Sequence, residues 1–283
     1  MMMETIRAVW QLARGWNLIF IFAAVWVGGS VGAADFQASR ALLGGLAAMG
    51  LGAFGNAVND ILDCHLDAIG KPHRPLPSGR LSVPAAIAWA ALFAVAALLC
   101  AVPLGSLVTA VVLATLVILW SYSRFLKGWH GIGHVLVAWF SGMVFVFGAL
   151  AQGESFAGVF PHAWSAAALG FLWHLAREWV KSAEDLEEDR SGGIRTLAVE
   201  LGARRACRMA ALVLTLLVCL LPVPWAKGWF SFTYLLIAAV GVAPMLTATA
   251  YYLWNDPDPE RLGQLSFVLK WTMPLGVIAV WLG

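Results

Sequence analysis

The chain is a succession of long apolar stretches separated by short polar segments, and this alternation restricts its fold more than any other feature. Nine stretches have the length that a helix needs to cross a membrane, about 20 residues. They are residues 17–34, 40–61, 84–103, 106–123, 132–151, 163–182, 206–223, 230–252 and 264–282. Backbone polar groups in lipid must be hydrogen-bonded within their own segment, which a helix achieves. The sequence therefore predicts an all-α polytopic membrane protein with nine transmembrane helices.

The composition excludes a single soluble domain. Hydrophobic residues make up 61% of the chain and charged residues only 12%, whereas a soluble domain carries about 25% charged residues. No linker, repeat array or low-complexity segment interrupts the pattern. We expect residues 1–283 to form one transmembrane domain, and we expect no nucleic-acid partner.

The distribution of charge predicts the orientation. In a chain with nine spans, the side of the N-terminus also holds the connections after spans two, four, six and eight. Of the 18 Lys and Arg residues, all except Arg40 and Lys227 fall on or near that side. Basic residues concentrate on the cytoplasmic side of membrane proteins. The N-terminus is therefore predicted to be cytoplasmic, and the acids follow the same pattern, since only Asp35 and Glu154 fall on the other side.

A first cluster of polar residues follows the second apolar stretch, in the sequence NAVNDILDCHLDAIGKPHRPLPSGR at residues 56–80. Asn59, Asp63 and Asp67 recur every four residues, which places them along one stripe of a helix. Carboxylates this close repel one another unless a cation lies between them. Oxygen ligands of this kind suit magnesium or calcium. The three prolines are expected to stiffen the following turn and to hold its basic residues, Arg74 among them, near the acids.

A second cluster follows the sixth stretch, in the sequence REWVKSAEDLEEDRSGGIRTL at residues 177–197. Asp185 and Asp189 are again four residues apart, and Glu178 and Lys181 fall on roughly the same helix face. Two acidic stripes mixed with basic residues suit metal ions that bind a diphosphate. An ordinary solvated loop would explain charged helix ends, but not the repeated four-residue spacing.

Further candidate residues lie near the ends of other stretches. Asn17 and Arg14 are close to the start of the first stretch, and Tyr122 and Lys127 close the fourth. Lys270 lies inside the ninth stretch, where an unpaired ammonium is costly, so a phosphate or the membrane interface is its expected partner. Transport is an alternative function, but the acids of transporters usually lie near the bilayer midplane.

The motifs NDILDCHLD and KPHRPLPSGRLS, followed by REWVK, DLEED and GIRTLAVELG, resemble those of the UbiA superfamily of intramembrane prenyltransferases. The resemblance covers essentially the whole chain and includes SYSRFLK at the end of the fourth stretch. His134 departs from the pattern, since the family often has asparagine after the glycine. The resemblance implies helices around a central lipid-open cavity and a polyprenyl diphosphate donor bound through Mg²⁺.

The resemblance also implies roles for individual residues. The implied metal ligands are Asn59, Asp63, Asp67, Asp185 and Asp189. The implied catalytic residues are Asp63, Asp67, Asp185, Asp189 and Lys181. The implied substrate-binding residues are Asn17, Asn59, Arg74, Tyr122, Lys127 and Lys270.

Within the superfamily, the form KPHRPLPSG is similar to that of digeranylgeranylglyceryl phosphate synthases and chlorophyll synthases, and the GIRTL sequence is similar to that of the former. This similarity implies a geranylgeranyl donor and a lipid acceptor, geranylgeranylglyceryl phosphate, at the cytoplasmic face of the cell (inner) membrane. An aromatic acceptor or a chlorophyllide remains the alternative. The oligomeric state does not follow from the sequence.

Overall fold

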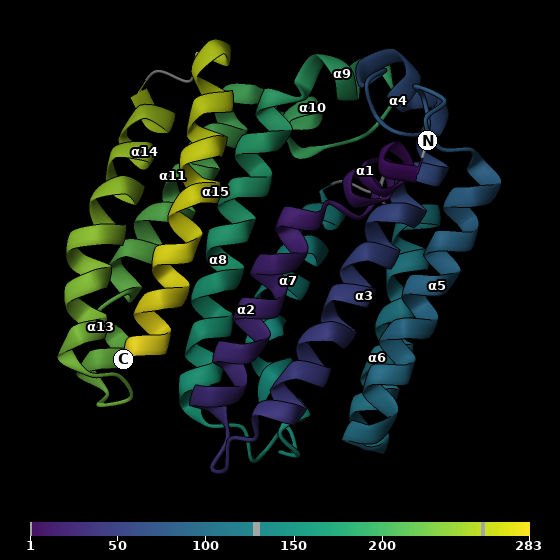
Figure 1. Ribbon diagram of the computed structural model, residues 1–283. Coiled ribbons are helices and arrows are strands. Elements are labelled where there is room, and N and C mark those ends of the chain that lie inside the picture. The colour runs from purple at the N-terminus through teal and green to yellow at the C-terminus, as the bar shows by residue number, and fades with distance from the viewer. Residues whose placement is uncertain (1, 127–130, 256–257) are drawn as a thin grey trace. The chain divides into compact units, whose positions relative to one another are not determined.

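The computed structural model describes residues 2–126, 131–255 and 258–283, and these residues form helices and no strand (Figure 1). The chain divides into two compact units. Unit 1 comprises Met1–Gly29, Ala33–Leu126 and Phe147–Gly158, and unit 2 comprises Ser30–Gly32, Lys127–Val146 and Val159–Gly283. The first polar cluster belongs to unit 1 and the second to unit 2.

Unit 1 is built on α3 (Ala38–Leu62), which packs beside α5 (Val83–Ala101) and α6 (Ser106–Ser121) (Figure 1). The first two apolar stretches form α2 (Gly15–Gly32) and α3. The remaining elements are α1 (Met2–Ala13), α4 (Cys64–Gly70), the 3-10 turn η1 (Val102–Leu104) and the π-helical turn η2 (Tyr122–Leu126).

Small residues allow α3 to approach its neighbours closely. Ala47, Ala53 and Ala57 are buried on this helix, and a Cβ atom added at Gly50 would lie 2.9 Å from the carbonyl oxygen of Phe93 on α5. Lipid supplies no hydrophobic force between helices, so their association depends on close packing of this kind. A larger side chain at position 50 would separate α3 from α5.

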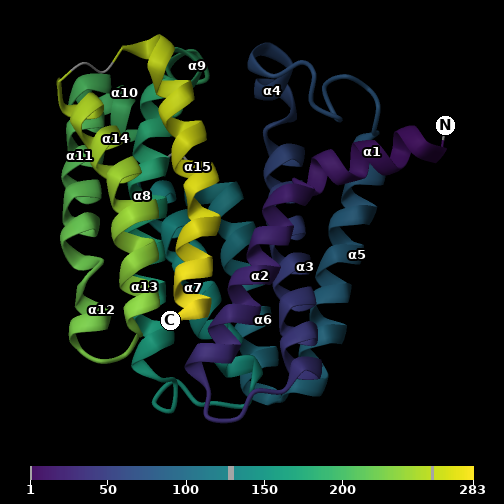
Figure 2. The same ribbon diagram turned by 60° about the vertical axis from the view of Figure 1, so that its left-hand side comes forward.

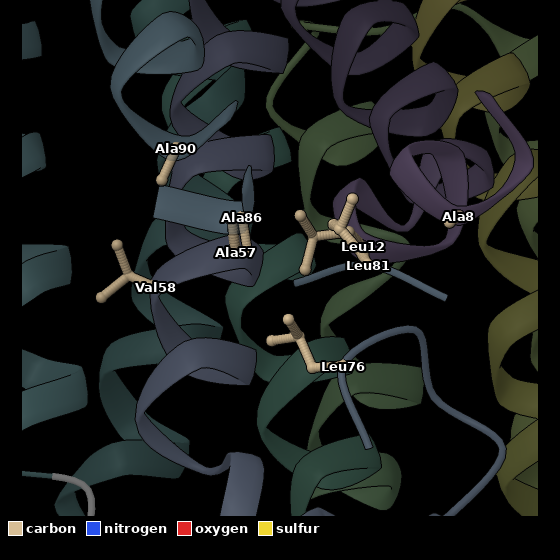
Figure 3. Close-up of a cluster of buried hydrophobic side chains, with 8 residues drawn as sticks. All are labelled: Ala8, Leu12, Ala57, Val58, Leu76, Leu81, Ala86 and Ala90. Carbon is tan, nitrogen blue, oxygen red and sulfur yellow. The ribbon is translucent and has the colours of Figure 1, made fainter. Parts of the chain in front are cut away.

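The helix α1 has 12 residues and is too short to cross a bilayer. It runs across α3 and α5 and not along them (Figure 2). Its inner face buries Ala8 and Leu12 against Leu76 and Leu81 from the loop after α4 (Figure 3). Its outer face exposes three apolar side chains, Met3, Ile6 and Trp10. An apolar outer face on a short helix is typical of a segment that lies in the membrane interface.

Unit 2 contains five long helical segments that lie roughly along one direction (Figures 1 and 2). They are α7 (Ile132–Ala151), whose last residues belong to unit 1, α8 (Pro161–Glu184), α11 (Ala203–Leu220), α14 (Ala243–Asn255) and α15 (Pro259–Leu282). The shorter elements are α9 (Leu186–Ser191), α10 (Leu197–Leu201), α12 (Val223–Ala226), α13 (Phe232–Leu236) and the π-helical turn η3 (Ile237–Val242). α8 packs against both α11 and α15.

The prediction of an all-α polytopic membrane protein is confirmed. Each of the nine apolar stretches coincides with a helical segment, within a few residues at each end. Among the described residues, eight helical segments are long and apolar enough to cross a membrane. The sixth stretch forms α8, which is not one of the eight and whose last two turns carry Arg177, Glu178 and Lys181. The count of nine spans, the central cavity, the cytoplasmic N-terminus and the single domain stay predictions.

Arg40, one of the two basic residues on the side with few charges, has a structural role in unit 1. It lies in the first turn of α3, and its Nε donates to the carbonyl of Ala151 at 2.8 Å. Its Nη2 donates to the carbonyl of Leu104 at 2.9 Å. Both acceptors are at the carboxyl ends of helices, where a cation is favoured by the helix dipole and by unpaired carbonyl groups.

Candidate functional site

The first cluster is built on a break between two helices. α3 ends at Leu62, Asp63 adopts φ −89° and ψ 2°, and α4 starts at the next residue. The N–H of Asp63 still donates to the carbonyl of Asn59 at 2.9 Å, and that of Asp67 to the carbonyl of Asp63 at 2.8 Å. The helical bonding between residues four apart therefore continues through the break and keeps the predicted spacing of the three side chains.

Arginines neutralise the buried acids of this cluster. Asp60 and Asp67 are only 4% and 5% exposed. Arg74 Nη1 donates to Asp67 Oδ2 at 2.6 Å and to Asp60 Oδ1 at 3.2 Å. Arg14 Nη2 donates to the same oxygen of Asp60 at 3.1 Å. A buried charge is tolerated only when it is paired and hydrogen-bonded, so these acids depend on the two arginines.

The pKa shifts in the cluster favour a further cation beside Asp67. Burial raises the pKa of Asp67, and the hydrogen bond and charge of Arg74 offset only part of this effect. Burial acts to lower the pKa of Arg74, but the carboxylates of Asp60 and Asp67 outweigh it and raise that pKa. A divalent cation beside Asp67 would favour its ionised form.

The backbone of Arg14 is specialised for this contact. Arg14 joins α1 to α2 with φ 55° and ψ 54°, and it is the only non-glycine residue with a positive φ in the described parts of the chain. This conformation costs an L-residue roughly 1–2 kcal/mol. The ion pair with Asp60, 46 residues away in sequence, is a compensating interaction at the same residue.

The loop after α4 holds Arg74 in place, as the three prolines indicated. The hydroxyl of Ser78 donates to the carbonyl of Arg74 at 2.6 Å, and Leu76 is buried in the core of unit 1 (Figure 3). Arg80 turns toward α1, where its Nη1 donates to Gln11 Oε1 at 2.8 Å, and its Nη2 donates to the carbonyl of His73. The loop thereby connects the cluster to α1.

The second cluster repeats the construction of the first. α8 ends at Glu184, Asp185 adopts φ −87° and ψ 11°, and α9 starts at the next residue. The N–H of Asp185 donates to the carbonyl of Lys181 at 2.8 Å, and that of Asp189 to the carbonyl of Asp185 at 2.9 Å. Here the neutralising cation is on the same helix, since Lys181 Nζ lies 2.9 Å from Asp185 Oδ2.

Arg177 and Glu178 lie about two turns before Asp185 on α8, and together with His134 on α7 they form a further polar group. Arg177 Nη1 donates to Glu178 Oε1 at 3.0 Å. Arg177 Nε and His134 Nδ1 are buried and have no hydrogen-bond partner among the described residues. Buried polar atoms in native proteins are normally paired, so this group calls for a ligand or another explanation.

The other predicted substrate-binding residues are distributed over both units. Asn17 is in the first turn of α2, Tyr122 begins η2, and Lys270 is half-buried near the middle of α15. Lys127 lies outside the described residues. Within unit 1 the structure brings Arg74 to Asp67, and within unit 2 it brings Lys181 to Asp185.

Magnesium suits the donors of each cluster. Among the described residues, no three side chains of His, Cys, Asp or Glu lie close enough together to hold a metal ion. Mg²⁺ usually takes one or two carboxylates from the protein and completes its shell with water and substrate phosphates. Two aspartates four residues apart, one at a helix break and the next on the short helix that follows, match that requirement.

The roles of Arg14 and Asp60 go beyond the sequence prediction, which places Arg14 only near the start of the first stretch and does not distinguish Asp60 from the other acids of residues 56–80. One feature of the sequence does separate Asp60 from the other acids. Asp60 follows Asn59 directly and is therefore turned about 100° away from the stripe of Asn59, Asp63 and Asp67. An acid in that position faces a different partner from the other two.

Comparison with known proteins identifies the family. Residues 17–272 match the UbiA prenyltransferase family. The digeranylgeranylglyceryl phosphate synthase of Halobacterium salinarum is 36% identical over 267 residues, which are 93% of this chain and 95% of that protein. A solved structure from work on the biosynthesis of digeranylgeranylglyceryl phosphate synthase in membranes has a TM-score of 0.77 at 25% identity, and the match covers 99% of this chain and 98% of that one.

A UbiA homologue from Archaeoglobus fulgidus, solved with GPP and Mg²⁺, has a TM-score of 0.61 and covers 96% of this chain and 99% of its own. Its identity of 18% supports a common fold. The family match spans far more than half of the chain and includes both clusters. The chain belongs to the UbiA prenyltransferase family and is an intramembrane prenyltransferase.

Proposed function

We propose that this prenyltransferase moves a geranylgeranyl group from its diphosphate to the free hydroxyl of geranylgeranylglyceryl phosphate, in the synthesis of ether lipids. The observation that carries the proposal is the 36% identity, over nearly the full length of both chains, to a protein named digeranylgeranylglyceryl phosphate synthase. The sequence GIRTL after the second cluster points to the same acceptor class.

The two clusters hold Mg²⁺ together with the donor diphosphate. Asn59, Asp63 and Asp67 are the ligands in unit 1, and Asp185 and Asp189 are the ligands in unit 2. Their oxygens are the donors that Mg²⁺ prefers, and the burial of Asp67 increases the benefit of a cation beside it. When bound, Mg²⁺ neutralises the charge that develops on the diphosphate as the allylic C–O bond breaks.

Basic side chains also stabilise the charge that develops on the diphosphate. Lys181 is already beside Asp185, and Arg74 beside Asp67, so each cluster has a donor for diphosphate oxygens. Interactions of this kind accelerate the reaction only if they strengthen as the leaving group gains charge. Four more residues complete the set that contacts substrate: Asn17, Tyr122, Lys127 and Lys270.

The active site faces the cytoplasm, and the protein lies in the cell membrane. Support comes from the concentration of Lys and Arg in the segments that carry the clusters. The isoprenoid tail of the donor stays in lipid while its diphosphate meets the polar segments. Exclusion of water from the reacting carbon prevents hydrolysis of the allylic cation.

A transfer assay on the purified full chain tests this function. Labelled geranylgeranyl diphosphate and Mg²⁺ are combined with geranylgeranylglyceryl phosphate, and in parallel with 4-hydroxybenzoate or homogentisate. We expect an ether product from the lipid alcohol that disappears with EDTA and returns with added Mg²⁺. A product formed only with an aromatic ring would contradict the proposed acceptor and indicate quinone precursor synthesis. Product that persists in EDTA would contradict the role of the metal.

A further inference from the structure

The ether-forming reaction requires a proton acceptor other than the proposed metal ligands of the two clusters. The hydroxyl of the acceptor must lose its proton as its oxygen bonds to the allylic carbon. Four aspartates are proposed metal ligands, so their lone pairs are already engaged: Asp63, Asp67, Asp185 and Asp189. Asp60 is paired with Arg14 and Arg74. Glu187 on α9 pairs with Arg190 and its side chain is 82% exposed, which leaves it in water and unsuited to this step.

Glu178 is placed differently from these acids. Its side chain is 17% exposed, and Arg177 is paired with it at 3.0 Å. It lies seven residues before Asp185 on α8, which corresponds to about 10 Å along the helix axis. A carboxylate at this depth is shielded from water and held near the cluster that is proposed to bind the diphosphate.

The packing of α7 against α8 brings a histidine to the level of Glu178. A Cβ atom at Gly170 would meet the Cα of Gly142 at 3.6 Å, so these two glycines mark where the helices touch. The helices run in opposite directions (Figures 1 and 2). Eight residues onward on α8 and eight residues back on α7 therefore place Glu178 and His134 at the same level along the two helices.

Two atoms of this polar group have unused hydrogen-bonding capacity. Arg177 Nε and His134 Nδ1 are both buried and lack a partner in the described part of the chain. A buried donor without a partner destabilises the folded protein. An anionic group that accepts from Arg177 would remove this penalty, and guanidinium is well suited to phosphate.

We propose that Arg177, Glu178 and His134 form the acceptor subsite, in which Glu178 takes the proton of the acceptor hydroxyl and Arg177 binds the phosphate beside that hydroxyl. This inference rests on the proposed function. The C–O bond to the diphosphate breaks and its electron pair leaves with the diphosphate. The acceptor oxygen bonds to the same carbon, and its proton passes to the Glu178 carboxylate.

Replacement of the carboxylate tests this role. General-base catalysis contributes about 100- to 10,000-fold, so Glu178→Gln is expected to lower ether formation at least about 100-fold. Binding of an unreactive geranylgeranyl thiolodiphosphate with Mg²⁺ should not change. Glu187→Gln is the matched control, since it removes an equivalent charge from an exposed pair, and it should retain full transfer.

A thiol analogue of the acceptor separates base catalysis from structural support. A thiol has a pKa of about 8.5 and needs little help to ionise. With geranylgeranylglyceryl phosphate carrying a thiol in place of the hydroxyl, the Glu178→Gln defect should shrink to about tenfold or less. An equal defect with both acceptors, or no defect with the alcohol, would overturn the role of Glu178. Glu178→Asp keeps the charge and should give an intermediate alcohol rate, which covers the case in which Glu178→Gln does not fold.

The proposed contact between Arg177 and the acceptor phosphate is tested by a separate measurement. Arg177→Lys keeps the charge but removes the Nε donor, so the KM for the acceptor should rise about tenfold while that for the donor stays constant. An unchanged acceptor KM would contradict the phosphate contact. Failure of the wild type to use the alcohol would overturn the proposed function and this role together. Normal wild-type transfer with fully active Glu178 variants would overturn this inference alone.

Discussion

The two acidic clusters share one local construction but differ in the source of their neutralising charge. In each, a long helix ends at an aspartate and a short helix carries the next aspartate four residues later. In unit 1 the cations come from Arg14 and Arg74, and the acids they contact are buried. In unit 2 the cation is Lys181, four residues away on the same helix, and the pair is partly exposed. The first cluster therefore depends on tertiary structure, whereas the second is largely local.

This difference determines what each cluster contributes to stability. Removal of one partner from a buried ion pair costs about 3–5 kcal/mol, because the other charge remains uncompensated. An exposed pair four residues apart on a helix is worth only about 0.3–0.5 kcal/mol. The two clusters can thus be equally necessary for the chemistry and still contribute very differently to the fold.

The largest expected effect tests whether the clusters are equal in catalysis. Asp63→Ala and Asp185→Ala each remove the aspartate at the helix break, and each should lower transfer at least about 100- to 1000-fold, as expected for loss of charge stabilisation in the transition state. The measurement is the rate of labelled ether formation with Mg²⁺ in excess. Membrane insertion and melting temperature of both variants serve as controls. Full activity in both would refute the metal assignment, and loss in only one would show that the clusters are not equivalent.

The next effect concerns stability. Asp60→Ala leaves Arg14 without its carboxylate and Arg74 with only Asp67, so it should destabilise the protein by about 3 kcal/mol. Lys181→Met removes the exposed pair of the second cluster and should cost no more than about 0.5 kcal/mol. Denaturant unfolding in detergent, followed by tryptophan fluorescence, compares the two variants directly. Equal losses would contradict the contrast between a tertiary and a local cluster.

The sequence predicts the local features of this molecule better than the tertiary ones. Nine apolar stretches locate the long helices because the length and composition of each stretch suffice. The pair of Lys181 and Asp185 also follows from spacing alone. The contact of Arg14 with Asp60 does not, since it joins residues 46 apart and depends on a positive φ at Arg14. The helix α1 escaped detection because 12 residues with one apolar face do not form a spanning stretch.

The charge pattern likewise predicts the orientation of the chain but not the contacts of a single residue. The predicted separation of basic residues by side follows from their distribution along the sequence, but the contacts of the exception at position 40 appear only in the fold. Arg40 binds the carboxyl ends of two other helical segments. Carbonyl groups distant in sequence thus explain why Arg40 lies at a position that is predicted to be on the side with few charges.

Arg40→Leu distinguishes stability from chemistry within unit 1. Arg40 is in the first turn of α3 and Asp60 in the last, about 30 Å apart along the helix at 1.5 Å per residue. Loss of two hydrogen bonds to carbonyl groups should cost about 2 kcal/mol. Unfolding in denaturant measures this loss, and the transfer rate at a temperature where the variant is folded should match the wild type. A large loss of transfer under those conditions would mean that the first cluster is sensitive to any weakening of unit 1.

The smallest expected effect uses the position in unit 2 that corresponds to Asp60. When Asp63 is aligned with Asp185, Asp60 falls on Ser182. Both residues are buried, at 4% and 3% exposure, and both contact the segment beyond their short helix. Asp60 does so through Arg74, and Ser182 does so by accepting the N–H of Ala198 on α10 at 3.2 Å.

Ser182→Ala should therefore cost about 1 kcal/mol, the price of one neutral hydrogen bond, against about 3 kcal/mol for Asp60→Ala. Hydrogen exchange of the Ala198 amide should accelerate, while transfer stays near the wild-type rate because no charge near the diphosphate changes. A Ser182→Ala variant as unstable as Asp60→Ala would show that the neutral contact supports the second cluster as strongly as the ion pairs support the first. The equivalent positions would then differ in chemistry but not in importance for the fold.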